Sequence, residues 1–108
     1  MATWQVAMAA EDLWAGEMTG VELGGMRVVL LNVAGEIRAF EDRCPHLGSR
    51  LTEGDLQDAT LVCASHLWEF DALSGNGINP GNCRLTAIGT RVREGRIELL
   101  MPVPGNIG

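Results

Sequence analysis

Cys44-Pro45-His46 opens, and Cys63-Ala64-Ser65-His66 closes, the stretch around which the rest of this 108-residue chain is organised. Sixteen residues separate the two ends, which contain both histidines of the chain and two of its three cysteines. Two Cys/His pairs brought together by one excursion supply four metal ligands. Two thiolates and two neutral imidazoles suit a tetrahedral zinc ion, or a 2Fe–2S cluster with two histidines on one iron.

The spacing within each pair bears on the choice between these two metals. Structural zinc fingers pair cysteine with cysteine and histidine with histidine, whereas both pairs here are mixed. Only one residue separates Cys44 from His46, so their convergence on a single tetrahedral ion is sterically awkward. Dividing each pair between two irons is easier. The sequence therefore favours an iron–sulfur cluster, with a structural zinc module as the alternative.

The order Cys-x-His, spacer, Cys-x2-His resembles the Rieske iron–sulfur family. The resemblance implies one 2Fe–2S cluster in which Cys44 and Cys63 hold the inner iron as thiolates. It places His46 and His66 on the outer iron, with their ring edges facing solvent. The fold implied is all-β: antiparallel sheets in a sandwich or barrel-like arrangement, with an inserted cluster-binding subdomain of two ligand loops.

Four positions near the ligands bear on the reduction potential. High-potential Rieske proteins carry a disulfide where this chain has Ser49 and Ser65. They also carry hydroxyl groups that donate hydrogen bonds to sulfur where this chain has Trp68 and Phe70. Such hydrogen bonds stabilise the reduced cluster and raise its potential. Their absence predicts a value near the low end of the Rieske range, about −150 mV.

The resemblance assigns other residues to the surroundings of the cluster. Pro45 lies inside the first ligand pair, and Leu47 and Leu67 are expected at an exposed tip that docks partner proteins. Pro80 falls where the family has a proline-containing loop over the cluster, although an ordinary surface turn explains the composition of that run equally well.

Four segments narrow the resemblance to the Rieske ferredoxins of toluene and benzene monooxygenases. They are residues 12–18, 44–46, 66–70 and 75–80. The resemblance implies an electron carrier rather than an enzyme. Its expected partners are a flavin-containing, NADH-dependent reductase and the diiron hydroxylase of an aromatic monooxygenase. The ferredoxin of an aromatic-ring dioxygenase system is the alternative.

Length and composition predict one domain over residues 1–108, with a cluster-binding subdomain at about 42–82. Fourteen glycines suggest a turn-rich β protein, and the net charge of −6 argues against nucleic acid or an anionic membrane as a partner.

All eight basic residues are arginine. Acid is concentrated between Glu36 and Asp71, with eight carboxylates against three arginines. This stretch is a solvated surface or an acidic collar that steers basic partners.

The expected location is the cytoplasm. The first residues lack the basic segment and long apolar run of a signal peptide. No apolar run approaches the roughly 20 residues that span a bilayer.

Alternation and apolar runs predict strands at 3–7, 17–23, 26–33, 36–40, 60–62, 67–70, 90–93 and 96–100. One short helical turn is expected near Glu11, and residues 75–81 are too rich in glycine and proline for regular structure. Trp4 and Trp14 are expected in the core. Cys83 is expected as a small buried residue outside the ligand set.

Overall fold

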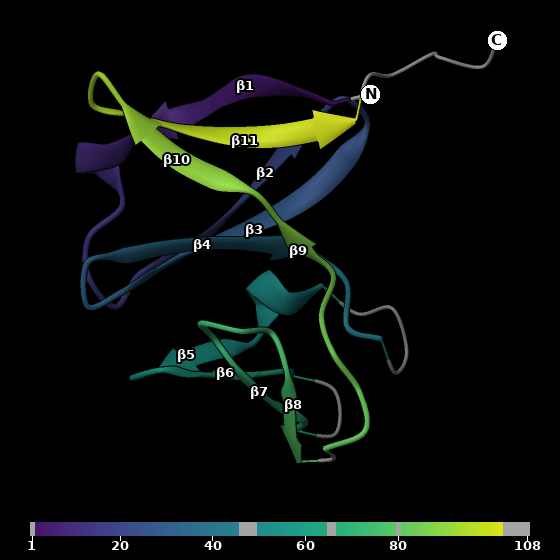
Figure 1. Cartoon of the computed structure of the whole chain (residues 1–108). Coiled ribbons are helices and arrows are strands. Elements are labelled where there is room, and N and C mark those ends of the chain that lie inside the picture. The colour runs from purple at the N-terminus through teal and green to yellow at the C-terminus, as the bar shows by residue number, and fades with distance from the viewer. Residues whose placement is uncertain (1, 46–49, 65–66, 80, 103–108) are drawn as a thin grey trace, which may run out of the picture.

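Three antiparallel sheets make up a computed structural model (Figure 1) that describes residues 2–45, 50–64, 67–79 and 81–102. The first sheet has the order β1 (Ala2–Ala9), β11 (Arg96–Pro102), β10 (Thr90–Arg93). The second has the order β2 (Met18–Leu23), β3 (Met26–Val33), β4 (Glu36–Glu41), β9 (Ala87–Ile88). The third has the order β5 (Asp55–Gln57), β6 (Thr60–Val62), β7 (Glu69–Asp71), β8 (Gly77–Asn79). Two 3-10 turns, η1 (Ala10–Asp12) and η2 (Leu51–Glu53), follow β1 and precede β5.

The second sheet is the middle layer, because β3 is covered on both faces. Val28 and Leu30 pack toward β11 in one cluster of buried side chains. Val29 and Leu31 pack toward the third sheet in the other. Successive side chains of a strand point to opposite faces, so a strand covered on both sides needs a continuous apolar run. The run at 28–31 meets this requirement.

Two-residue turns join β2, β3 and β4 of the middle sheet and fix the register of their pairing. Gly24 and Gly25 join β2 to β3 with φ of +57° and +81°, the left-handed pair that a type I′ turn requires. In the next turn, the side-chain oxygen of buried Asn32 accepts a hydrogen bond from the N–H of Gly35 at 2.7 Å. Short turns at both ends of β3 therefore hold β4 in line with the segment that carries Cys44.

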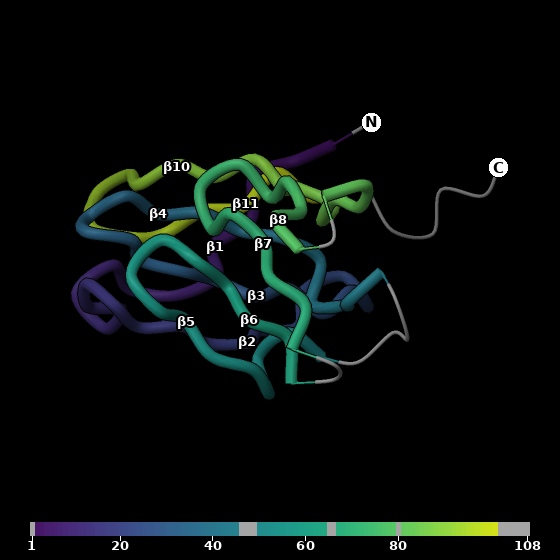
Figure 2. The backbone as a smooth tube through the Cα atoms, turned by 90° about the horizontal axis from the view of Figure 1, so that it is seen from below, coloured from purple at the N-terminus to yellow at the C-terminus, as the bar shows by residue number. Residues whose placement is uncertain are grey.

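The third sheet is inserted in the sequence between β4 and β9, and it packs against the open face of the middle sheet. Figure 2, the view from below, shows its strands lying across β2, β3 and β4. In both views, the segments after β4 and after β6 leave on the same side of the molecule. These segments carry Cys44 and Cys63.

Two predictions about the core are wrong, and a third holds only in part, because Cys83 is half-buried against the core rather than fully buried. Trp14 is 70% exposed and donates its indole N–H to the carbonyl of Glu11 at 2.8 Å, so its ring lies over η1. Trp4 is 38% exposed, and the guanidinium of Arg91 lies 4.2 Å from the centre of its ring. The register of β1 against β11 turns Trp4 outward, which general preferences for burial do not reveal.

The predicted strands all have counterparts, with differences near the ligand loops. Leu67 lies in a turn before β7 rather than in the strand. Residues 77–79 form β8, contrary to the prediction of irregular structure for 75–81, because the backbone of this run pairs with β7. β5, β9 and η2 were not predicted. No helix in the described part of the chain is long and apolar enough to cross a membrane.

Candidate metal centre

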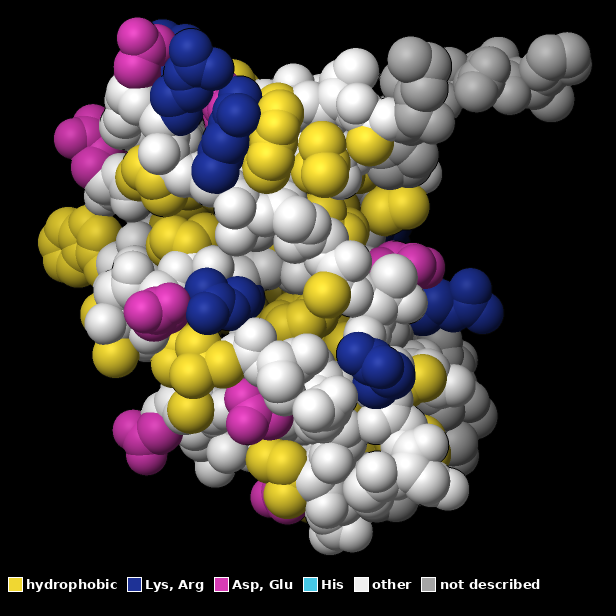
Figure 3. Space-filling model, in the orientation of Figure 1, with side chains coloured by type: hydrophobic (Ala, Val, Ile, Leu, Met, Phe, Trp, Pro, Cys, Tyr) yellow, Lys and Arg dark blue, Asp and Glu magenta, His cyan; other side chains and the backbone are white. Residues whose placement is uncertain are grey.

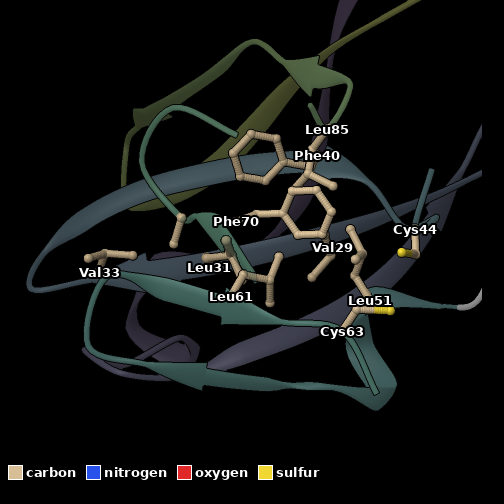
Figure 4. Close-up of a cluster of buried hydrophobic side chains, with 11 residues drawn as sticks. Val29, Leu31, Val33, Phe40, Cys44, Leu51, Leu61, Cys63, Phe70 and Leu85 are labelled. Carbon is tan, nitrogen blue, oxygen red and sulfur yellow. The ribbon is translucent and has the colours of Figure 1, made fainter. Parts of the chain in front are cut away.

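Two buried cysteines mark the centre. Cys44 lies just beyond the end of β4 and Cys63 directly follows β6, and both are fully buried. They belong to one cluster of buried side chains, and Figure 4 shows them at the same end of that cluster, near Leu51. Neither forms a disulfide. Thiols among apolar groups ionise when a metal compensates the charge, so this pair fits an iron or zinc centre.

Hydrogen bonds close the first ligand loop at its base. The carboxylate of Asp42, which is 6% exposed, accepts from the N–H of Thr52 at 3.0 Å and from its hydroxyl at 2.9 Å. The N–H of Asp42 in turn donates to the carbonyl of Arg27 on β3 at 2.9 Å. The Asp42–Thr52 pair therefore fixes both ends of the segment that carries Cys44 to the middle sheet.

The second ligand loop is closed by the backbone. The N–H of Cys63 donates to the carbonyl of Trp68 at 2.8 Å, which continues the β6–β7 pairing of Val62 with Glu69. Leu67 lies inside this loop with φ of +53°, a conformation that costs an L residue roughly 1–2 kcal/mol. Its side chain is 68% exposed. Loop closure therefore holds Leu67 in a left-handed conformation that presents an apolar side chain to solvent.

The two loops touch at Gly54. A Cβ atom at this position would lie 2.0 Å from the carbonyl oxygen of Val62 and 3.2 Å from the N–H of Ala64. No side chain fits there, so glycine allows the end of the first loop to approach the start of the second. This contact sets the separation between the segments that carry Cys44 and Cys63.

The described surroundings of the two thiols are apolar on the inside and open on the outside. Phe70 is fully buried in the group of apolar side chains that contains both thiols. Trp68 is partly exposed and packs against this group. Pro45 is exposed, as is Leu67. The phenyl ring of Phe70 has no group that can donate a hydrogen bond. Other predicted site residues lie outside the described part of the chain: His46, Leu47, Ser49, Ser65, His66 and Pro80.

The charges around the loops differ from a uniform acidic collar. Asp42 is buried and accepts hydrogen bonds from Thr52, so it does not belong to the surface. Glu53 and Asp55 do line a hollow beside Leu67. Arg43 and Arg50 flank the first ligand loop and line a different groove. The second loop is therefore bordered by acid, and the first by a groove that contains both arginines and carboxylates.

Comparison with known proteins decides which kind of metal centre the chain holds. Residues 3–88 match the Rieske 2Fe–2S domain. The chain belongs to the Rieske 2Fe–2S family. It is 39% identical over 90 residues to the ferredoxin component of the alkene monooxygenase system of Xanthobacter autotrophicus, a match that covers 82% of this chain and 74% of that protein. It is 32% identical over 75 residues to the naphthalene 1,2-dioxygenase ferredoxin of Pseudomonas putida, covering 69% and 72%.

Solved Rieske structures agree with the architecture. A chain in a complex of reduced oxygenase and oxidised ferredoxin of carbazole 1,9a-dioxygenase superposes with a TM-score of 0.83 at 25% identity, covering 93% of this chain and 96% of that one. The Sphingomonas yanoikuyae B1 ferredoxin superposes with a TM-score of 0.84 at 20% identity, covering 93% and 100%. The predicted fold class is confirmed.

Membership of the Rieske family means that this protein holds one Rieske-type 2Fe–2S cluster. The predictions of the cofactor and of a ferredoxin of an oxygenase system are confirmed, and the zinc interpretation is wrong. The buried pair Cys44 and Cys63 fits the thiolate side of such a cluster, because its apolar surroundings exclude competing solvent ligands.

Sequence reasoning missed three residues that shape the centre. The sequence places Asp42 among the eight acidic residues between Glu36 and Asp71, and it gives no signal for Thr52 or Gly54. Asp42 and Thr52 are ten positions apart, and nothing in their spacing marks them as partners. The value of Gly54 depends on its approach to Val62, a contact that only the folded chain shows.

Proposed function

We propose that this chain is the Rieske ferredoxin of a multicomponent monooxygenase and carries one electron at a time from a reductase to an oxygenase. The observation that carries the proposal is the match to the alkene monooxygenase ferredoxin, which is 39% identical over 90 residues. The naphthalene dioxygenase ferredoxins are 31–32% identical over 75 residues, and a biphenyl dioxygenase ferredoxin is 38% identical over only 64 residues. The match also covers more of this chain, 82% against 69%. A dioxygenase ferredoxin is the second candidate, supported by the number of such relatives at similar coverage.

The proposed ligands are Cys44 and Cys63 on the inner iron and His46 and His66 on the outer iron. The burial of both thiols in one cluster supports the first pair. The second pair rests on the sequence pattern, since neither histidine lies in the described residues. The cluster supplies a one-electron redox couple. Around it, Asp42 and Thr52 hold the first loop closed and Gly54 holds the two loops together.

We further propose a low reduction potential. The side chain of Phe70 lies among the buried apolar residues that include both thiols, and its phenyl ring cannot donate a hydrogen bond to sulfur. A cluster without that hydrogen bond favours its oxidised form and passes electrons on readily. This suits a carrier supplied by a flavin-containing, NADH-dependent reductase, and we expect a diiron hydroxylase as the acceptor. We place the protein in the cytoplasm, where reducing conditions keep thiols free of disulfides.

Reconstitution tests the proposal. The purified brown protein is reduced by NADH and the reductase of the same system, and turnover is then measured with the hydroxylase of that system or with a ring-dioxygenase oxygenase. We expect turnover with the monooxygenase and little with the dioxygenase. Turnover with the dioxygenase alone would support the second candidate. A protein without a visible iron–sulfur spectrum would refute both.

A further inference from the structure

Three arginines from three segments line one groove beside the first ligand loop. Arg27 lies on β3, Arg43 precedes Cys44, and Arg50 precedes η2. Glu22 and Glu41 line the same groove, together with buried Asp42. Figure 3 shows basic and acidic side chains next to one another on the face of the molecule that it draws.

The groove arginines have no carboxylate partner among the described residues. No ion pair within 4.0 Å joins them to the carboxylates that share the groove, although Arg38 pairs with Glu36 and Arg91 with Glu98 elsewhere. The oxygens of Asp42 already accept from Thr52. All three arginines are exposed, so their guanidinium donors face solvent.

Two of the arginines place the groove next to the first ligand loop. Arg43 and Arg50 bracket the first ligand loop in the sequence and line one groove in the structure. Arg43 also lines a neighbouring hollow with Pro45 and Arg84, which extends the basic side around the same loop. A guanidinium group binds a carboxylate through two parallel hydrogen bonds, and arginine is enriched in protein interfaces. A protein that contacts this groove therefore lies beside Cys44.

We propose that this groove, lined by Arg27, Arg43 and Arg50, docks a carboxylate side chain of an electron-transfer partner. The inference rests on the proposed function and adds the chemistry by which the partner is recognised. Glu22 and Glu41 make the groove mixed in sign, and the chain has a net charge of −6. Both features disfavour a polyphosphate or nucleic acid. The three arginines of the groove still complement a single acidic group on a folded protein surface.

The test compares two double variants with equal net charge. Arg43→Gln with Arg50→Gln removes two groove arginines. Arg93→Gln with Arg96→Gln removes two arginines from the β10–β11 hairpin. Figure 1 places this hairpin on the opposite side of the molecule from the segment that follows β4. Visible spectra and reduction potentials of the holoproteins establish that both clusters are intact and matched. The KM for ferredoxin is then measured with the reductase and with the oxygenase, at low and at high salt.

We expect the groove variant to raise KM for at least one component by about 2-fold to 30-fold over the hairpin variant, the range for two exposed ion pairs. High salt should shrink this difference. Equal KM values for the two variants with both components would overturn the groove proposal while wild-type turnover leaves the proposed function standing. Failure of the wild-type protein to accept or pass electrons would instead refute the proposed function.

Discussion

Removal of one hydroxyl group at the base of the first ligand loop should loosen the cluster without unfolding the protein. Thr52→Val keeps the shape of the side chain and deletes the hydroxyl that donates to the carboxylate of Asp42 at 2.9 Å. The N–H of Thr52 still donates to the same carboxylate at 3.0 Å. The variant therefore isolates one of the two bonds that hold the loop closed.

The size of the expected effect depends on the burial and the charge of Asp42. Asp42 is 6% exposed, and a hydrogen bond to a charged group is worth about 1.5–3 kcal/mol. We expect the iron–sulfur cluster to be lost when the loop opens. Loss of this hydrogen-bond free energy makes the open form of the loop about 10-fold to 100-fold more common, since each 1.4 kcal/mol is a factor of ten. Asp42→Ala should act more strongly, because it removes both bonds and leaves the N–H of Thr52 without its acceptor.

The assay is the rate at which visible absorption of the holoprotein bleaches in excess chelator. Thr90→Val is the matched control, because it also deletes a threonine hydroxyl bond, to the carbonyl of Ile37 at 3.3 Å, in sheets away from the thiols. Thermal unfolding of both variants separates local from global effects. Equal bleaching rates for Thr52→Val and Thr90→Val would refute the role of the Asp42–Thr52 pair in holding the loop.

Three further predictions concern the two thiols and their neighbours. Phe70→Tyr should raise the reduction potential by roughly 20–60 mV, if part of a charged hydrogen bond distinguishes the two oxidation states; voltammetry that shows no rise would place residue 70 away from sulfur. Gly54→Ala should cost about 3 kcal/mol, the upper end of the usual range for overpacking, and lower cluster content, because its Cβ would overlap the carbonyl of Val62; normal iron content and unfolding temperature would contradict this contact. Cys44→Ser should abolish the Rieske spectrum while Cys83→Ser preserves it, and iron analysis with electron paramagnetic resonance distinguishes the two outcomes.

Much of the fold follows from the sequence because its local signals agree with its tertiary contacts. The run Val28–Leu31 predicts a strand, and the burial of both its faces explains why every residue is apolar. Gly24-Gly25 predicts a hairpin, and the left-handed φ angles at both positions require those residues. The Cys/His pairs predict a metal centre, and both cysteines do lie in one buried cluster.

The failures occur where a residue's role depends on a partner far along the chain. Trp4 and Trp14 are large and apolar, yet strand register and a local indole hydrogen bond keep them at the surface. Residues 77–79 have weak intrinsic preference for a strand and form β8 because β7 offers an edge. Tertiary pairing overrides propensity in this run.

The same dependence explains why the surroundings of the centre were harder to predict than the centre itself. A metal ligand must be one of a few residue types at a fixed spacing, so Cys44 and Cys63 stand out in a single sequence. A residue that positions a ligand needs only to reach a backbone group, as Thr52 reaches Asp42, or to leave room, as Gly54 does. Many residue types and spacings satisfy these demands elsewhere in proteins. Their roles here follow only from the approach of the two loops to each other and to the middle sheet.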